Sequence, residues 1–242
     1  MSRFDFRDFS IDQTDSPLKV STDAILLGAS IAIPQDVTRV LDVGTGTGVI
    51  AMILASRFEQ LYITALEPNH KAYSQAVINF ENASFSERLE ICPDPIATFR
   101  PEALFDVVVS NPPYFIDDLK SADPDQLQAK HLDESAFYDF IEACTMVLKP
   151  TGLFWLILPK SIAENVLAFM LQKGFGLIHK TRFHSNQNKP DIRWVLAFEK
   201  NEGESAIAAD GCFEKELTLR NLDGSFHQDY IALAGYLHAK KL

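Results

Sequence analysis

The chain has 242 residues, 47% of them hydrophobic, and its 33 acidic and 22 basic residues give a formal net charge of -11. This length and apolar content allow one substantial core, so we expect a single domain made of an N-terminal segment (1–38), a core (39–200) and a C-terminal extension (201–242). The negative charge disfavours nonspecific binding to phosphate backbones, so a nucleic-acid partner needs a local basic face.

Cysteine usage argues against a metal-binding or disulfide-rich protein, and hydropathy argues against a secreted or membrane-spanning one. The three cysteines, Cys92, Cys144 and Cys212, lie far apart and form no CxxC pair, which predicts a reduced interior without a metal site. The first ten residues lack the apolar stretch of a signal peptide, and no later run approaches the length of a membrane span. We therefore expect a cytoplasmic protein that is not inserted in a membrane.

Short apolar runs alternate with segments of helical period, which is typical of a parallel sheet wrapped by helices. The predicted strands of this part are 39–43, 61–66, 89–92, 105–110 and 153–158. The predicted helices are 48–58, 69–82 with Asn69 as N-cap, and 134–148, which ends at the turn 149–152. The run 105–110 is the most apolar, as expected of a central strand that is buried on both faces.

The last third of the chain has a different pattern. A helix is predicted over 162–173, and two strands, 175–183 and 193–199, are expected to close the sheet as an antiparallel pair. Residues 201–210 have the composition of a linker. A further strand over 215–220 and a terminal helix over 226–238 complete the prediction.

A glycine-rich loop, Asp42-Val43-Gly44-Thr45-Gly46-Thr47-Gly48, joins the first of these strands to its helix. Glycines let the backbone turn sharply and approach a ligand, although a tight turn alone is the simpler alternative. The spacing D-x-G-x-G-x-G differs from the G-x-G-x-x-G of dinucleotide enzymes, and its leading acid suits a ligand with an amino group and no pyrophosphate. Glu67 ends the next strand, where a carboxylate can accept hydrogen bonds from a ribose. Together they favour S-adenosylmethionine over NAD.

The tetrapeptide Asn111-Pro112-Pro113-Tyr114 follows the most apolar strand directly. An exocyclic amine is a poor nucleophile because its lone pair is delocalised, so a catalyst needs two acceptors that orient its N–H bonds. The Asn111 amide oxygen and the Pro112 carbonyl can provide them, and Tyr114 offers a ring for stacking on a planar substrate. The alternative is a proline-stiffened turn, but ligands bind at the carboxyl ends of strands in open α/β sheets. We therefore predict that Asn111, Pro112 and Tyr114 are catalytic.

These motifs together resemble the class I methyltransferases that act on amino groups. Two further segments indicate a more specific family within this class. They are the upstream run 18–29, with the pattern K-V-x-T-D-x-I-L-L-G-A, and the later L-x-x-R-N-x-D-G segment. The whole chain resembles the tRNA1(Val) (adenine-37-N6)-methyltransferase family, which acts in the anticodon loop. The resemblance implies a Rossmann-like α/β fold, with a mostly parallel seven-stranded sheet and helices on both faces. It also implies S-adenosyl-L-methionine as cofactor and a tRNA anticodon stem-loop as partner.

The resemblance also implies roles for single residues. The residues that it places at the cofactor are Lys19, Thr22, Asp42, Gly44, Gly46, Glu67, Asp94 and Asn111. Asp42, Gly44 and Gly46 would surround the methionine part, and Asp94 would lie near the adenine, unless it is a solvated loop acid. Lys19 and Thr22 would lie at the mouth of the pocket, whereas the alternative for Thr22-Asp23 is helix capping before 24–33.

Basic residues near the end of the chain predict where RNA binds. Lys180, Arg182, Lys189 and Arg193 concentrate on two predicted strands and their connection, and Phe115 could line the base pocket or pack under its loop. The alternative for the basic residues is a solvated sheet edge that is kept charged against aggregation.

Two other functions stay open from the sequence. The first is a protein glutamine methyltransferase, because the side-chain amide of its substrate presents a similar NH₂ group to the same tetrapeptide. Such enzymes carry a helical recognition domain ahead of the catalytic one, and only 41 residues precede Asp42. A noncatalytic module that binds the cofactor or RNA is the second alternative, against which the intact Asn111 and Tyr114 argue.

Overall fold

The computed structural model describes residues 3–14, 19–112, 124–200 and 212–240, with only the backbone in 124–134. Its centre is a mixed sheet of eight strands in the order β10-β8-β9-β7-β6-β3-β4-β5. The strands are β3 (Arg39–Val43), β4 (Tyr62–Leu66), β5 (Leu89–Cys92), β6 (Phe105–Ser110), β7 (Leu148–Pro159), β8 (Phe175–Asn186), β9 (Asp191–Lys200) and β10 (Phe213–Arg220). Only β9 runs antiparallel to its neighbours.

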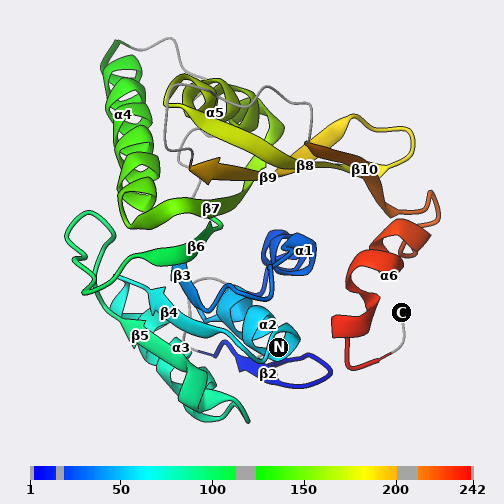
Figure 1. The fold of residues 1–242 in the computed structure, drawn as a ribbon. Helices are drawn as coiled ribbons and strands as arrows, with labels where there is room; N and C mark the ends of the chain where they lie inside the picture. Colours follow the sequence, from blue (N-terminus) through cyan, green and yellow to red (C-terminus); the bar gives the residue numbers. More distant parts are fainter. Residues whose placement is uncertain (1–2, 15–18, 113–123, 201–211, 241–242) are drawn as a thin grey trace.

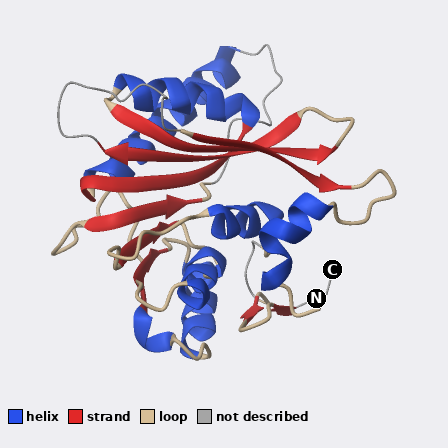
Figure 2. Ribbon diagram, turned by 45° about the vertical axis from the view of Figure 1, so that its right-hand side comes forward, coloured by secondary structure: helices blue, strands red, loops and turns tan. Residues whose placement is uncertain are grey.

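Helices cover both faces of this sheet (Figure 1). One face carries α1 (Thr22–Ser30), α2 (Val49–Arg57), α3 (His70–Glu81) and α6 (Gln228–Ala234), and the other carries α4 (Pro124–Met146) and α5 (Lys160–Gln172). Two hydrophobic cores follow from this arrangement, one on each face. Figure 2 shows the strands as a layer between the two groups of helices. The α/β fold with helices on both faces is therefore confirmed.

The N-terminal segment adds a small antiparallel ribbon of β1 (Arg3–Asp5) and β2 (Ser10–Asp12), which the sequence analysis missed. Aromatic side chains pack together at this ribbon: the rings of Phe6 and Phe9 stack with centroids 4.5 Å apart. Phe6 also forms a backbone bridge with His238, which follows the 3₁₀ helix η2 (Gly235–Leu237), so the two ends of the chain lie side by side (Figure 1). Strands of three residues give too short a pattern to be recognised in a sequence.

Several predicted elements are confirmed with their boundaries. β3, β5 and β6 begin and end where the sequence predicts, and the Asn69 side chain caps α3 by accepting from the backbone N–H groups of Lys71 and Ala72. A second 3₁₀ helix, η1 (Ser86–Arg88), precedes β5.

Other predictions need correction. The sheet has eight strands instead of seven, because β10 pairs in parallel with the free edge of β8. Leu217 of β10 is buried in the core on the face that carries α1, α2 and α6. α4 begins earlier than predicted, at Pro124. The turn 149–152 lies inside β7, where the register with β6 jumps from Leu148 to Leu153 and Thr151 has a φ of 58°. An irregularity of the β6–β7 ladder thus replaces a simple loop at this point.

Candidate active site at the carboxyl edge of the sheet

Four adjacent parallel strands end in one row at the same edge of the sheet. Cys92 is paired with Leu66, Leu66 with Val43, and Val43 with Ser110. Glu67, Gly44 and Asn111 directly follow Leu66, Val43 and Ser110, and Asp94 lies two residues after Cys92. The register therefore brings four predicted site residues from distant parts of the sequence to one edge.

The glycine loop turns over the end of β4. The backbone N–H groups of Gly44 and Thr45 both donate to the Leu66 carbonyl, at 2.9 and 3.0 Å. Gly44 and Gly46 have positive φ angles, 74° and 61°, and a Cβ atom added at either position would meet no atom within 4 Å. These two positions thus leave open space above a backbone that favours glycine, which is a cradle that a ligand can enter.

The carboxylate of Glu67 holds this loop in place. One of its oxygens accepts from the Gly46 N–H at 2.8 Å, and the other accepts from the Asn69 N–H at 2.8 Å. The side chain is buried in the described structure. Because each carboxylate oxygen can accept more than one hydrogen bond, both keep acceptor capacity for a ligand hydroxyl.

Asp42 lies beneath the loop and is completely buried. Its Oδ2 accepts from the Thr45 hydroxyl at 2.6 Å and from the Ala51 N–H at 3.1 Å, whereas its Oδ1 has no hydrogen-bond partner among the described residues. Burial raises the pKa of this carboxyl to about 7, against the two hydrogen bonds, which lower it. The Asp42 carboxyl therefore holds the glycine loop against the beginning of α2 through Thr45 and Ala51.

Asn111 and Pro112 follow β6 at the same edge, where Asn111 is half-buried and Pro112 is buried. The hydroxyl of the preceding residue, Ser110, donates to the Val43 carbonyl at 2.8 Å and is fully buried. This bond ties the start of the tetrapeptide to the start of the glycine loop. The sequence analysis missed Ser110, and a polar residue at the end of an otherwise apolar strand is the signal that could have found it. Tyr114 and Phe115 lie outside the described residues.

The beginning of α1 also reaches this edge. The Asp23 carboxylate accepts from the Arg193 guanidinium at 2.8 Å, and Arg193 is paired with Pro159 at the end of β7. Thr22 is exposed beside Asp23, and Lys19 precedes them with its ammonium on the Gln13 carbonyl at 2.5 Å. The N-cap of α1 is Ser21, whose side chain accepts from Ala24, so the capping alternative for Thr22-Asp23 is wrong.

The four basic residues proposed to bind RNA divide into two groups. Lys180 and Arg182 lie on the face of β8 that carries α5, since the Lys180 ammonium is 4.7 Å from the centroid of the Trp194 ring. Glutamates on the neighbouring strand β10 pair with both, Glu214 with Lys180 at 3.7 Å and Glu216 with Arg182. These two glutamates offset the charge of Lys180 and Arg182.

The second group lies at the carboxyl edge. Lys189 is exposed in the turn between β8 and β9, while Arg193 forms the ion pair with Asp23. Lys160, at the beginning of α5, pairs with Asp191 at 2.9 Å and adds a third cation there. Three cations thus lie at the carboxyl edge, and two of them, Arg193 and Lys160, are paired with carboxylates there.

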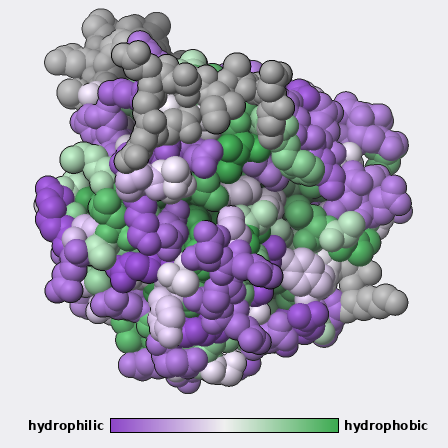
Figure 3. Space-filling model, viewed as in Figure 1, coloured by the Kyte–Doolittle hydropathy of each residue, from purple (hydrophilic) through white to green (hydrophobic). Residues whose placement is uncertain are grey.

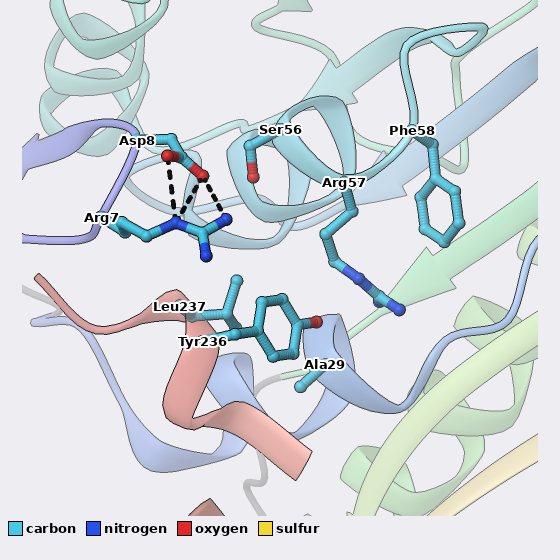
Figure 4. A pocket seen from close by; sticks show the side chains of 8 residues that line it. All are labelled: Arg7, Asp8, Ala29, Ser56, Arg57, Phe58, Tyr236 and Leu237. Atoms are coloured by element: carbon cyan, nitrogen blue, oxygen red, sulfur yellow. Dashed lines mark hydrogen bonds and ion pairs between the residues drawn. The ribbon is translucent and has the colours of Figure 1, made fainter. Parts of the chain in front are cut away.

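A pocket of about 380 Å³ lies at the opposite ends of α1 and α2 (Figure 4). Its lining includes Arg7, which is paired with Asp8, and Arg57, whose guanidinium donates to the Gly28 carbonyl. Arg57 thus satisfies a carbonyl near the end of α1 while it ends α2, which is a structural role. The pocket is separated from the glycine loop by the length of α2.

Hydrophilic residues cover most of the described surface on the face seen in Figure 3, with hydrophobic residues in separate groups between them. In the part of the chain that the structure describes, no helix has both the length and the apolar character to cross a membrane. The same residues contain no cluster of three or more His, Cys, Asp or Glu side chains arranged to hold a metal ion.

Solved structures share this fold. A predicted O-methyltransferase from Agrobacterium tumefaciens is 20% identical and superposes with a TM-score of 0.67 over 90% of this chain and 98% of its own. A glycopeptide N-methyltransferase in complex with S-adenosylmethionine is 14% identical and superposes with a TM-score of 0.54 over 77% of this chain and 100% of its own. At these identities the likeness shows the fold, a class I methyltransferase fold.

Sequence relatives indicate a more specific family than the fold does. The Methyltransferase small domain family matches residues 21–185. The tRNA1(Val) (adenine(37)-N6)-methyltransferase of Pedobacter heparinus is 39% identical over 81% of this chain and 83% of its own. The protein of that name from Flavobacterium psychrophilum is 31% identical over 98% of this chain and 99% of its own. The chain therefore belongs to the S-adenosylmethionine-dependent tRNA1(Val) (adenine(37)-N6)-methyltransferase family.

Proposed function

We propose that the chain transfers a methyl group from S-adenosylmethionine to the N6 atom of adenine 37 in tRNA1(Val), the reaction that names its family. The observation that carries this proposal is the pairing of Val43 with Ser110. Because Gly44 follows one residue of this pair and Asn111 follows the other, the cofactor cradle and the amine-binding tetrapeptide are neighbours. Methyl transfer needs this proximity.

The described residues fit the cofactor. Open space above Gly44 and Gly46 accommodates the methionine part, and the two oxygens of Glu67 have acceptor capacity for the ribose hydroxyls. Asp42 supports the loop, and its Oδ1, which has no partner among the described residues, leaves a free acceptor under this site. Asp94, exposed after β5, is in the position that we assign to the adenine. When bound, S-adenosylmethionine supplies a methyl group on a sulfonium, which is electrophilic without a metal.

The chain's own catalytic task is to hold the target amine. In this proposal the Asn111 side-chain oxygen accepts one N–H of the amine and the Pro112 carbonyl accepts the other. Both acceptors favour a pyramidal nitrogen whose lone pair points toward the methyl group. Tyr114 stacks on the adenine ring, and Phe115 lines the same pocket. Ser110 fixes where this segment starts.

RNA is proposed to approach the carboxyl edge as an anticodon stem-loop. An unpaired adenine of a loop can turn into a pocket, whereas a paired one keeps its amine in a base pair. Lys189 and Arg193 at this edge are the nearest candidates for phosphate contacts. Arg193 can contribute only if a phosphate replaces Asp23 as its partner. The same holds for Lys180 and Arg182, whose partners are Glu214 and Glu216. A tRNA substrate also agrees with the cytoplasmic location expected from the sequence.

The test is made in cells. Position 37 of tRNA1(Val) is analysed by mass mapping in cells that carry the gene, that lack it, and that carry the Asn111→Ala variant. We expect N6-methyladenosine only with the intact gene. Methylation that persists without the gene would refute the substrate assignment, and a changed glutamine methylation in proteins would favour the rival enzyme.

A further inference from the structure

Asn79 is a buried amide of α3 that joins three parts of the chain. Its Nδ2 donates to the Thr47 carbonyl at 2.8 Å and to the Asp12 carbonyl at 2.9 Å, and its Oδ1 accepts from the Asp12 N–H at 2.8 Å. The side chain is only 2% exposed. Both amide hydrogens and the amide oxygen are therefore used, and all three bonds go to backbone groups of other segments.

The first of these segments is the glycine loop. Thr47 lies between Gly46 and Gly48, whose backbones have φ angles of 61° and 90°. A loop with several glycines loses much conformational freedom when it adopts one shape, so bonds that hold it matter for its order. Asn79 donates to the loop at the Thr47 carbonyl, while Glu67 accepts from the N–H of the preceding residue, Gly46.

The second segment leads to the start of α1. The side chain of Gln13, next to Asp12, accepts from the Val20 N–H at 2.8 Å, and the Gln13 carbonyl accepts from the Lys19 ammonium. Ser21 then caps α1. A continuous series of hydrogen bonds thus runs from the glycine loop through Asn79 to the residues beside Thr22.

We infer that Asn79 is a positioning residue of the cofactor site, which sets the N-terminal segment carrying Lys19 and Thr22 against the glycine loop. It does not itself contact the cofactor. Shortening its side chain leaves the buried Thr47 carbonyl and both backbone groups of the half-buried Asp12 without these partners. The loop and the N-terminal segment then move independently, and the cofactor must order both when it binds. The inference rests on the proposed cofactor site.

The test compares Asn79→Ala with Asn82→Ala, a matched control at the end of the same helix. Asn82 is exposed, and its amide donates within the helix to the Ile78 carbonyl. Calorimetry on folded full-length protein should show that Asn79→Ala weakens S-adenosylmethionine binding by about tenfold or more, while the control stays within about twofold. The turnover rate at saturating cofactor should change far less than the KM for cofactor, because Asn79 does not reach the target amine.

Wild-type affinity in folded Asn79→Ala would overturn the inference, since a residue with only a structural role changes thermal stability and not cofactor affinity. If Asn79→Ala does not fold, Gln13→Ala decides, because it breaks the same series of bonds outside α3: weaker binding supports the inference and unchanged binding refutes it. Hydrogen exchange adds a direct readout. The Asp12 amide should exchange faster in Asn79→Ala than in the control. Failure of the wild-type protein to bind the cofactor would instead refute the proposed function.

Discussion

Ser110 donates a hydrogen bond from its hydroxyl to the Val43 carbonyl at 2.8 Å, across two adjacent parallel strands. The bond is buried and lies one residue before both Asn111 and Gly44. It reinforces the last residue pair of the two strands, directly before Gly44 and Asn111.

Ser110→Ala should therefore affect both stability and catalysis. Loss of one buried hydrogen bond is expected to lower the free energy of unfolding by about 1 kcal/mol. Methyl transfer should fall further than cofactor affinity, because Asn111 moves relative to the cradle. Urea unfolding and steady-state kinetics measure the two effects. Wild-type kinetics in a destabilised variant would show that the bond has no part in alignment.

Glu67→Ala should weaken cofactor binding by about 1–3 kcal/mol, the cost of leaving ribose hydroxyls unpaired. The structure adds a second reason, because the Gly46 N–H also loses its acceptor. Glu67→Gln keeps one acceptor oxygen, so calorimetry should rank it between the wild type and Glu67→Ala. Equal affinity of all three proteins would remove Glu67 from the site.

Asn111→Ala should abolish methyl transfer while cofactor affinity stays nearly intact, because the amide oxygen serves the target nitrogen in our proposal. In the same assay, Tyr114→Phe should retain much more activity than Tyr114→Ala, since stacking needs the ring and not the hydroxyl. If the phenylalanine variant is as inactive as the alanine variant, the Tyr114 hydroxyl has a role of its own.

Asp42 should make stability depend on pH. Burial raises its pKa to about 7 in the folded protein, whereas an unfolded chain has an ordinary Asp pKa of about 3.9. Between these values the folded state binds more protons, so the contribution of Asp42 to the unfolding free energy falls as the pH rises from about 4 to 7. The difference in stability between wild type and Asp42→Asn, from denaturant unfolding across this range, should show that fall. A difference that rises with pH would mean that the folded structure stabilises the charged carboxylate.

Local patterns in the sequence predicted most of the site. β3 and β6 are apolar runs with clear ends, so their boundaries were confirmed, and with them the neighbouring positions of Gly44 and Asn111. Partners from distant segments could not be predicted. The pairing of Arg182 with Glu216 depends on the register of β10, and the three bonds of Asn79 depend on how the N-terminal segment crosses α3. Both are set by tertiary packing and leave no periodic signal.

The central claim is methylation of one adenine, and purified protein with labelled S-adenosylmethionine tests it most directly. Unmodified tRNA1(Val) is compared with two other substrates. One is the same tRNA with guanine at position 37, and the other is the anticodon stem-loop sequence annealed to its complement. We predict one label per tRNA, recovered as N6-methyladenosine at position 37, and none in the other two substrates. Label in the guanine-37 tRNA at a comparable rate, or label in a protein acceptor with none in RNA, would contradict the account.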